Sequence, residues 1–322
     1  MMKCWVSNQK LGIGGLSLQE KPRPVLKKGH ILVKVSHSAL NFSDLLMIND
    51  KYQICPARPF IPGQEIVGII EDIDPSLDYE IGEMIASKVL WGGFAEFVLV
   101  RADMAIKVPK KYPPPQAAAL PISYTTALIA LNYCSALSKK DTVLIHAAAG
   151  GVGLASVEVA QSKGANIIAS ASSSLRLEVA KKHGANHVVN YSNKNWFDEV
   201  NEITNGKGAD IILDPVGGDI GEHSLRCLAM DGKLLIVGFA SGKMQKLAPH
   251  RLLLKRASAV GVYWNHDEDK DLLRGTTKEL ENLILTKQIN PLIDKRFEFN
   301  ELPTALSELN DRKVIGKIVL PI

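Results

Sequence analysis

The sequence predicts an α/β protein in which β-rich segments at both ends of the chain flank a doubly wound parallel sheet. Short apolar alternations broken by glycine and proline fill about the first 110 residues. Strands then alternate with helical segments from residue 141 to about 264, and strand-like pieces return after about residue 270. At 322 residues, the chain exceeds the length at which one hydrophobic core usually stops growing, so we expect two domains.

The N-terminal region is expected to be barrel-like, because runs such as residues 30–35 and 94–100 alternate in the period of a strand. The prolines at 113–115 interrupt this pattern, and residues 116–136 predict a helix that is kinked or restarted near Pro121. The tail predicts a helix over 272–286 and strands near 297–299 and 317–320. These pieces resemble the first region, so we expect the tail to rejoin it.

The central region predicts βαβ units and therefore a parallel sheet. The expected strands are residues 143–146, 167–171, 187–190, 209–214, 233–239 and 258–263, and the expected helices are residues 152–163, 175–183, 196–204, 220–228 and 247–255.

The composition is ordinary, with 46% hydrophobic and 22% charged residues. The net charge of +4 is spread along the chain, so nucleic acid is not expected as a partner. The N-terminus MMKCWVSNQK lacks a signal-peptide pattern, and no apolar run reaches the ~18 residues of a membrane span, so we expect a cytoplasmic protein without membrane contact. The four cysteines form no Cys-x-x-Cys pair, and neither a zinc knuckle nor a disulfide framework is predicted.

Residues 142–153, TVLIHAAAGGVG, join a strand to a helix through a glycine cluster. Aligned with the dinucleotide fingerprint G-x-G-x-x-G, the three positions are Ala148, Gly150 and Gly153. Gly150 would let the backbone approach a pyrophosphate, and Gly153 would let the helix lie close to the strand, while N–H groups of the first helical turn face the anion. The alternative interpretation is an ordinary glycine-rich turn.

The segment after the next strand indicates which dinucleotide is bound. An NAD site would place an acidic residue about 20 residues past the fingerprint. The segment is instead SASSSLR, residues 170–176, in which Ser172 and Arg176 suit a 2′-phosphate. NADPH is therefore favoured over NADH, the alternative being a solvent-facing Arg176.

Six segments in order carry a resemblance to a known family: Asn41–Asp44, Ile61–Glu65, AAAGGVG, Asp214–Gly218, Ile236–Gly242 and Val314–Leu320. The chain resembles the zinc-free NADPH:quinone oxidoreductase (zeta-crystallin-like) branch of the medium-chain dehydrogenase/reductase superfamily. The resemblance implies a GroES-like β-barrel domain, which we assign to residues 1–122 and 268–322. It also implies a Rossmann NADPH-binding domain, assigned to residues 123–267, with the active site in the cleft.

Zinc-dependent relatives place a cysteine near Asn41 and a histidine where this chain has Gln64. Their lobe of four cysteines is also missing, because Ile81–Ile85 is followed almost directly by Trp91. An amide does not replace thiolate or imidazole as a zinc ligand, so no metal is predicted. Without a Lewis acid the hydride acceptor must already be electron-poor, as quinones and enones are.

The resemblance implies that Asn41, Tyr52 and Gln64 line the substrate side of the site. Asn41 could instead cap the helix that follows it, and Tyr52 could be a half-buried aromatic residue. A neighbouring position that is aromatic in some relatives is Leu46 here. The implied cofactor-binding residues are Thr126, Gly150, Gly151, Val152, Gly153, Ser172, Arg176, Tyr191, Val216, Gly238, Phe239, Ala240 and Arg312. Tyr191 and Arg312 could equally be surface residues.

We therefore predict an NADPH-dependent, zinc-independent quinone oxidoreductase. Pairing of residues 234–237 and 259–263 across a twofold axis would give the homodimer usual in the family. Two other functions stay open: reduction of activated C=C bonds in 2-alkenals or enoyl thioesters, and NADPH binding without catalysis.

Overall fold

The computed structural model describes residues 1–322, except for the side chain of Arg296, and divides the chain into two compact units. Unit 1 comprises residues 1–122, 277–285 and 291–322, and unit 2 comprises residues 123–276 and 286–290. The domain boundaries given above stay a prediction. No helix in the described part of the chain is both long and apolar enough to cross a membrane.

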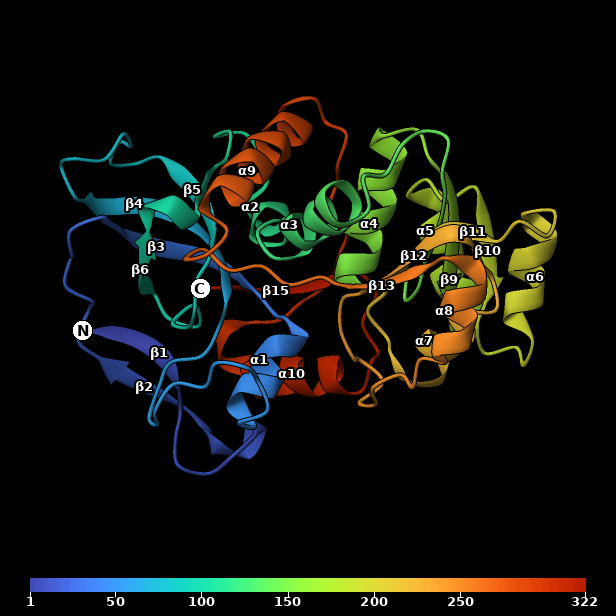
Figure 1. The fold of residues 1–322 in the computed structure, drawn as a ribbon. Coiled ribbons are helices and arrows are strands. Elements are labelled where there is room, and N and C mark those ends of the chain that lie inside the picture. The colour runs from blue at the N-terminus through green and yellow to red at the C-terminus, as the bar shows by residue number, and fades with distance from the viewer. The chain divides into compact units, whose positions relative to one another are not determined.

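Unit 1 is built on a seven-stranded sheet in the order β14-β15-β3-β4-β5-β7, with β6 also paired to β3 (Figure 1). A separate pair, β1 (Met2–Ser7) and β2 (Leu16–Lys21), is antiparallel. The remaining strands are β3 (His30–Ala39), β4 (Glu65–Ile73), β5 (Met84–Lys88), β6 (Phe97–Arg101), β7 (Ala105–Lys107), β14 (Ile293–Arg296) and β15 (Lys317–Pro321). The alternating apolar runs form these strands, because every second side chain faces the core.

The C-terminal tail rejoins this sheet, as predicted. Strand β15 pairs antiparallel with β3, with Val319 opposite Ala39, and β14 pairs parallel with β15. The strand predicted at residues 297–299 is wrong. The chain there leaves β14 and begins a 3₁₀ turn, Phe299–Glu301, in which the Glu298 backbone N–H donates to the Glu301 carboxylate at 2.8 Å. A capping box of this kind favours a helix start over an extended strand.

Three α-helices lie within unit 1: α1 (Phe42–Ile48), α2 (Pro114–Ala118) and α10 (Leu302–Asn310). The unit boundary falls within a fourth, α9 (Lys270–Leu285). Helices α1 and α10 share one apolar cluster that includes Leu45, Ile48 and Leu306, all at most 5% exposed. This packing fixes the helix that begins directly after Asn41.

Unit 2 is a six-stranded parallel sheet in the order β10-β9-β8-β11-β12-β13. Numbered along the chain, this is the 3-2-1-4-5-6 order of a dinucleotide-binding sheet, with its switch point beside β8. The strands are β8 (Thr142–Ile145), β9 (Asn166–Ala171), β10 (His187–Asn190), β11 (Ala209–Asp214), β12 (Leu228–Ile236) and β13 (Ser258–Gly261). The connecting helices are α4 (Gly151–Ser162), α5 (Ser174–Lys182), α6 (Trp196–Ile203), α7 (Gly218–Ser224) and α8 (Pro249–Lys255).

The helix expected from residue 116 to 136 restarts after Pro121, as predicted: α2 ends at Ala118, α3 (Ser123–Leu128) follows Pro121, and a π-helix, Ile129–Cys134, comes next. One further predicted element differs in the structure. The strand expected at 233–239 ends at Ile236, so Val237–Phe239 lie in the loop beyond the sheet. That loop hydrogen-bonds to the end of β11, because the Val237 N–H donates to the Asp214 carbonyl at 3.0 Å.

Candidate functional site

The glycine-rich segment forms the turn between β8 and α4. The residue before it, Ala147, has a φ of 47°, in the left-handed region. A Cβ on Gly153 would overlap the carbonyl oxygen of Ala147 and lie 2.7 Å from the Cα of Ala148. Gly153 therefore admits no side chain, because the first turn of α4 packs directly on the backbone of the incoming loop.

Gly150 has a different constraint. A Cβ there would meet only the carbonyl oxygen of Ala147, at 3.3 Å, so atoms of the chain crowd this position much less than Gly153. Gly150 is the N-cap of α4 and offers no side chain to the first helical turn, which Gly151, Val152 and Gly153 begin. A helix N-terminus with this character attracts an anion, and a glycine cradle lets a phosphate approach closely.

Three predicted residues follow strands β9 and β10 at their carboxyl ends. Ser172 comes directly after β9, and Arg176 lies in the first turn of α5. The backbone N–H of Tyr191 donates to the Ala171 carbonyl at 3.1 Å, and the Tyr191 ring contacts the ring of His146 edge-on at 6.2 Å. Tyr191 is thus half-buried and packs against the core of unit 2.

Val216, Gly238, Phe239 and Ala240 come together where two loops meet. The Ala240 N–H donates to the carbonyl of Pro215 at 3.0 Å, which ties the loop after β12 to the turn after β11. The turn is fixed by Asp214, whose buried carboxylate accepts from the N–H groups of Val216 and Gly217 at 2.8 and 2.9 Å. Burial raises the pKa of Asp214.

The carboxyl ends of β8 to β12 therefore hold eleven of the predicted cofactor residues, because parallel strands all end at one edge of a sheet: Gly150, Gly151, Val152, Gly153, Ser172, Arg176, Tyr191, Val216, Gly238, Phe239 and Ala240. Thr126 lies in α3, is 8% exposed, and accepts a hydrogen bond from the Trp264 indole at 3.1 Å. Arg312 lies in unit 1, in the turn after α10, with a φ of 56°.

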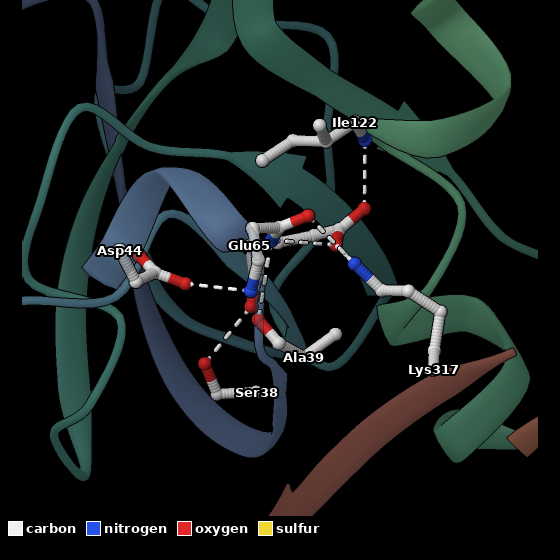
Figure 2. A network of polar contacts seen from close by, with 7 residues as sticks. Ser38, Ala39, Asp44, Glu65, Ile122 and Lys317 are labelled. Atoms are coloured by element: carbon white, nitrogen blue, oxygen red, sulfur yellow. Dashed lines mark hydrogen bonds and ion pairs between the residues drawn. The ribbon is translucent and has the colours of Figure 1, made fainter. Parts of the chain in front are cut away.

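In unit 1, Asn41 is the N-cap of α1 and belongs to a buried polar network. Its partners Asp44, Glu65 and Lys317 are labelled in Figure 2. Its Oδ1 accepts from Lys317 Nζ at 2.7 Å, and its Nδ2 donates to Glu65 Oε2 at 3.0 Å. Its backbone N–H donates to Asp44 Oδ2 at 2.8 Å, which closes a capping box. The cap suggested by the sequence is present, and the side chain is also held by residues far away in the chain.

Glu65 lies at the centre of this network in Figure 2. Its Oε2 accepts from Lys317 Nζ at 2.7 Å and its Oε1 from the Ile122 N–H at 2.7 Å. The Glu65 side chain is fully buried and that of Lys317 is 8% exposed. Because the charges of Glu65 and Lys317 cancel, Asp44 adds a carboxyl group to the network beyond this ion pair. Burial raises its pKa to about 7, against the lowering effects of the Asn41 N–H and of Lys317.

Gln64 and Tyr52 lie between Asp44 and Glu65 in the sequence. Gln64 is 2% exposed, its Nε2 makes one long contact with the Leu90 carbonyl at 3.4 Å, and its Oε1 is buried with no hydrogen-bond partner. Burying an amide oxygen without a hydrogen-bond partner costs free energy. Such unsatisfied atoms are rare in folded proteins, and a functional role is one explanation for them. Tyr52 is half-buried against the apolar cluster that contains Leu45 and Ile48.

Sequence reasoning missed Glu65 and Lys317 as parts of the site. Each is a charged residue beside a run of apolar strand residues, Glu65 before IVGII and Lys317 before IVLP. A charge in that setting must be paired, and this was the available signal. The described residues contain no group of three or more His, Cys, Asp or Glu side chains that could hold a metal ion.

Comparisons with known proteins agree with both units. Residues 27–110 match the family model described as alcohol dehydrogenase GroES-like domain, and residues 151–282 match the one described as zinc-binding dehydrogenase. A quinone oxidoreductase-like protein 2 homolog from Nematostella vectensis is 37% identical over 309 residues, which cover 92% of this chain and 82% of that protein.

Two solved structures cover all of this chain and all of their own. The quinone oxidoreductase of Thermus thermophilus, also solved as a complex with NADPH, is 30% identical with a TM-score of 0.88. A mycobacterial protein solved with NADPH is 27% identical with a TM-score of 0.92.

A GroES-like sheet and a dinucleotide-binding sheet in one chain define the medium-chain dehydrogenase/reductase class of oxidoreductases. This chain belongs to the quinone oxidoreductase family of that class. The predicted fold class and family are thereby confirmed.

Proposed function

We propose that the protein is an NADPH-dependent oxidoreductase that reduces quinones without zinc. The turn at Gly150–Gly153 is the observation that supports cofactor binding most strongly. Backbone atoms of the chain exclude a side chain at Gly153, whereas the space beside Gly150 at the helix N-terminus is open. The two full-length structural neighbours solved with NADPH support the same cofactor. When bound, NADPH supplies a hydride.

The residues of unit 2 have distinct proposed roles in holding this cofactor. The first turn of α4 binds the pyrophosphate, and Ser172 and Arg176 bind the 2′-phosphate. Tyr191 lies beside the adenine end, and the loop at Gly238–Ala240 supports the nicotinamide. Thr126 and Arg312 are proposed as further contacts.

We propose that the acceptor is held by Asn41, Tyr52 and Gln64. A quinone is electron-poor, so catalysis needs positioning and donors for the oxygen that becomes negative. The second N–H of Asn41 makes only a 3.4 Å contact with the Ala39 carbonyl, and Gln64 Nε2 is also weakly engaged. Both amides can therefore donate to an acceptor oxygen at low cost. Zinc independence rests on the donor set, since Asn41 and Gln64 offer amides where thiolate and imidazole would be needed.

A homodimer is proposed through the edge of the unit 2 sheet. Strand β13 is the last strand in the order, and nearby helix α8 exposes Leu253 and Leu254 by 78% and 73%. Exposed apolar side chains beside a strand edge mark a surface for association. The mass in solution measured by light scattering tests this, with the charged variant Leu254→Glu expected to shift it toward the monomer. Cytoplasmic localisation stays a prediction.

The function is tested by one panel of acceptors. NADPH oxidation is followed with quinones, 2-alkenals and enoyl thioesters, before and after prolonged chelation. Fast, chelator-resistant reduction of quinones supports the proposal. Preference for an alkenal or enoyl thioester would replace the quinone with an activated C=C bond. Tight NADPH binding with no turnover on any acceptor would show a binding protein.

A further inference from the structure

The carboxamide of Asn41 lies between a group that only donates hydrogen bonds and a group that only accepts them. The ammonium of Lys317 has three N–H donors and no acceptor, and the ionised carboxylate of Glu65 has no donor. They contact Oδ1 at 2.7 Å and Nδ2 at 3.0 Å. Rotating the Asn41 carboxamide by half a turn about its Cβ–Cγ bond would place the N–H groups against the Lys317 ammonium and the oxygen against the Glu65 carboxylate. The amide therefore has one allowed orientation.

The two charged groups that impose this orientation are themselves held in place. Both oxygens of Glu65 are used, one by Lys317 and Asn41 and the other by the Ile122 N–H at 2.7 Å. Charge-assisted hydrogen bonds in a buried setting are short and strong. The carboxylate and the ammonium thus form a rigid frame around the amide.

We infer that Glu65 and Lys317 are positioning residues that fix the Asn41 amide with one Nδ2 hydrogen left for the acceptor oxygen. This inference rests on the proposed function. The remaining Nδ2 hydrogen makes only the 3.4 Å contact with Ala39. In the flipped amide an oxygen would stand there and would repel the negative charge that develops on a reduced quinone. Orientation of this kind affects turnover more than binding.

The test removes both charges together, because removing one alone leaves the other buried without a partner. In the double variant Glu65→Gln/Lys317→Met, the amide introduced at position 65 can donate or accept, so either orientation of Asn41 is tolerated. Lys317→Arg is the conservative variant, since a guanidinium also only donates. Lys295→Met is the control: it breaks a Lys–Glu pair of 2.6 Å between Lys295 in the neighbouring strand β14 and Glu308 in α10, whose side chains are 41% and 25% exposed.

We expect the double variant to lose about twofold to tenfold in kcat for quinone reduction, because two tolerated orientations halve the competent population and the amide is no longer anchored. Complete loss of one transition-state donor would cost about a hundredfold to a thousandfold. KM and the NADPH dissociation constant should stay within about twofold of the wild type, because the lost interaction is not a ground-state one. Lys317→Arg and Lys295→Met should keep most of the wild-type kcat. The inference is overturned if the double variant keeps the wild-type kcat. It is also overturned if Lys295→Met lowers kcat as much as the double variant does.

A second measurement does not depend on activity. In protein labelled with ¹⁵N-asparagine, the side-chain signals of Asn41 are assigned by their loss in Asn41→Ser. The Nδ2 hydrogen that donates to Glu65 should exchange slowly with water in the wild type and faster in the double variant. Rapid exchange of both Nδ2 hydrogens in the wild type overturns the inference even if the double variant does not fold. If the wild type reduces no acceptor, the proposed function fails, while this exchange measurement still decides whether the amide is held.

Discussion

The carbonyl oxygen of Ala147 occupies the space that a Cβ on Gly153 would need. Ala147 reaches this position through its left-handed φ of 47°, which turns its carbonyl toward the first turn of α4. The contact sets the distance between the end of β8 and the helix. It explains physically why the third glycine of the fingerprint is kept, whereas the first is replaced by Ala148, whose N–H donates to the Ser170 carbonyl at 3.0 Å.

Gly153→Ala and Gly150→Ala should therefore fail in different ways. Gly153→Ala forces backbone atoms apart and should lower the free energy of unfolding by about 1 to 3 kcal/mol, as overpacking does. Gly150→Ala should cost less stability and weaken NADPH binding by about tenfold or more, since its methyl group would fill the anion cradle. Urea unfolding and fluorescence titration with NADPH measure the two effects. Unchanged NADPH affinity in Gly150→Ala would remove this turn from the cofactor site.

Arg176→Ala tests which dinucleotide is preferred. A lost hydrogen bond to a charged group costs about 1.5 to 3 kcal/mol, so NADPH binding should weaken roughly tenfold or more, with NADH binding nearly unchanged. Lys182→Ala, at the other end of the same helix and also a loss of one positive charge, should affect neither cofactor much. Equal losses for both cofactors in Arg176→Ala would show that Arg176 does not contact the 2′-phosphate.

His146 should make the fold sensitive to acid. The imidazole is fully buried and lies 2.6 Å from Ser170 Oγ and 2.8 Å from Ser224 Oγ. Burial lowers its pKa from 6.5 to about 3, so only the unfolded chain takes up the proton between these values. The stability it contributes is present above about pH 6.5 and falls by up to about 1.4 kcal/mol for each pH unit below that.

His146→Gln keeps one donor and one acceptor but removes the titration. Urea unfolding at about pH 7 and about pH 5 should show a smaller loss of stability in this variant than in the wild type, by roughly 1 to 2 kcal/mol. An identical loss in both proteins would mean that His146 is not the group responsible.

Asp44 should have the opposite effect. Its folded pKa of about 7 lies above the ordinary value of 3.8, chiefly because the carboxyl is buried. Its contribution to stability is complete below about pH 4 and is lost as the pH rises through 7. Asp44→Asn should therefore gain stability relative to the wild type as the pH is raised from about 4 to about 8, measured by thermal unfolding. A relative loss over that interval would contradict the assignment of the buried proton to Asp44.

Local patterns in the sequence were sufficient for much of the fold. The glycine cluster between an apolar strand and a helix gave the position of the turn at Gly150, and the alternation of strands and helices gave the parallel sheet. Parallel strands place their carboxyl ends together, so residues after several different strands could be assigned to one edge. The return of Lys317–Pro321 to the first sheet followed from its strand-like character.

The polar network could not be predicted in this way. Asn41 and Lys317 are separated by 276 positions, and their hydrogen bond depends on the register between β3 and β15. No local pattern encodes such a register. Similarly, Glu158 of α4 accepts from Tyr124 at 2.6 Å and from the Asn290 N–H at 2.9 Å, a link between distant segments that the sequence did not indicate.

Zinc-independent reduction of quinones by NADPH can be measured anaerobically on chelator-treated protein. NADPH and a quinone are mixed with the enzyme, and the loss of NADPH absorbance is compared with the amount of quinone reduced. We expect rapid oxidation of one NADPH for each quinone reduced by two electrons, and much slower oxidation of NADH. Adding zinc should not increase the rate. Activity that appears only after zinc is added, or NADPH that binds and is never oxidised, would contradict the proposed function.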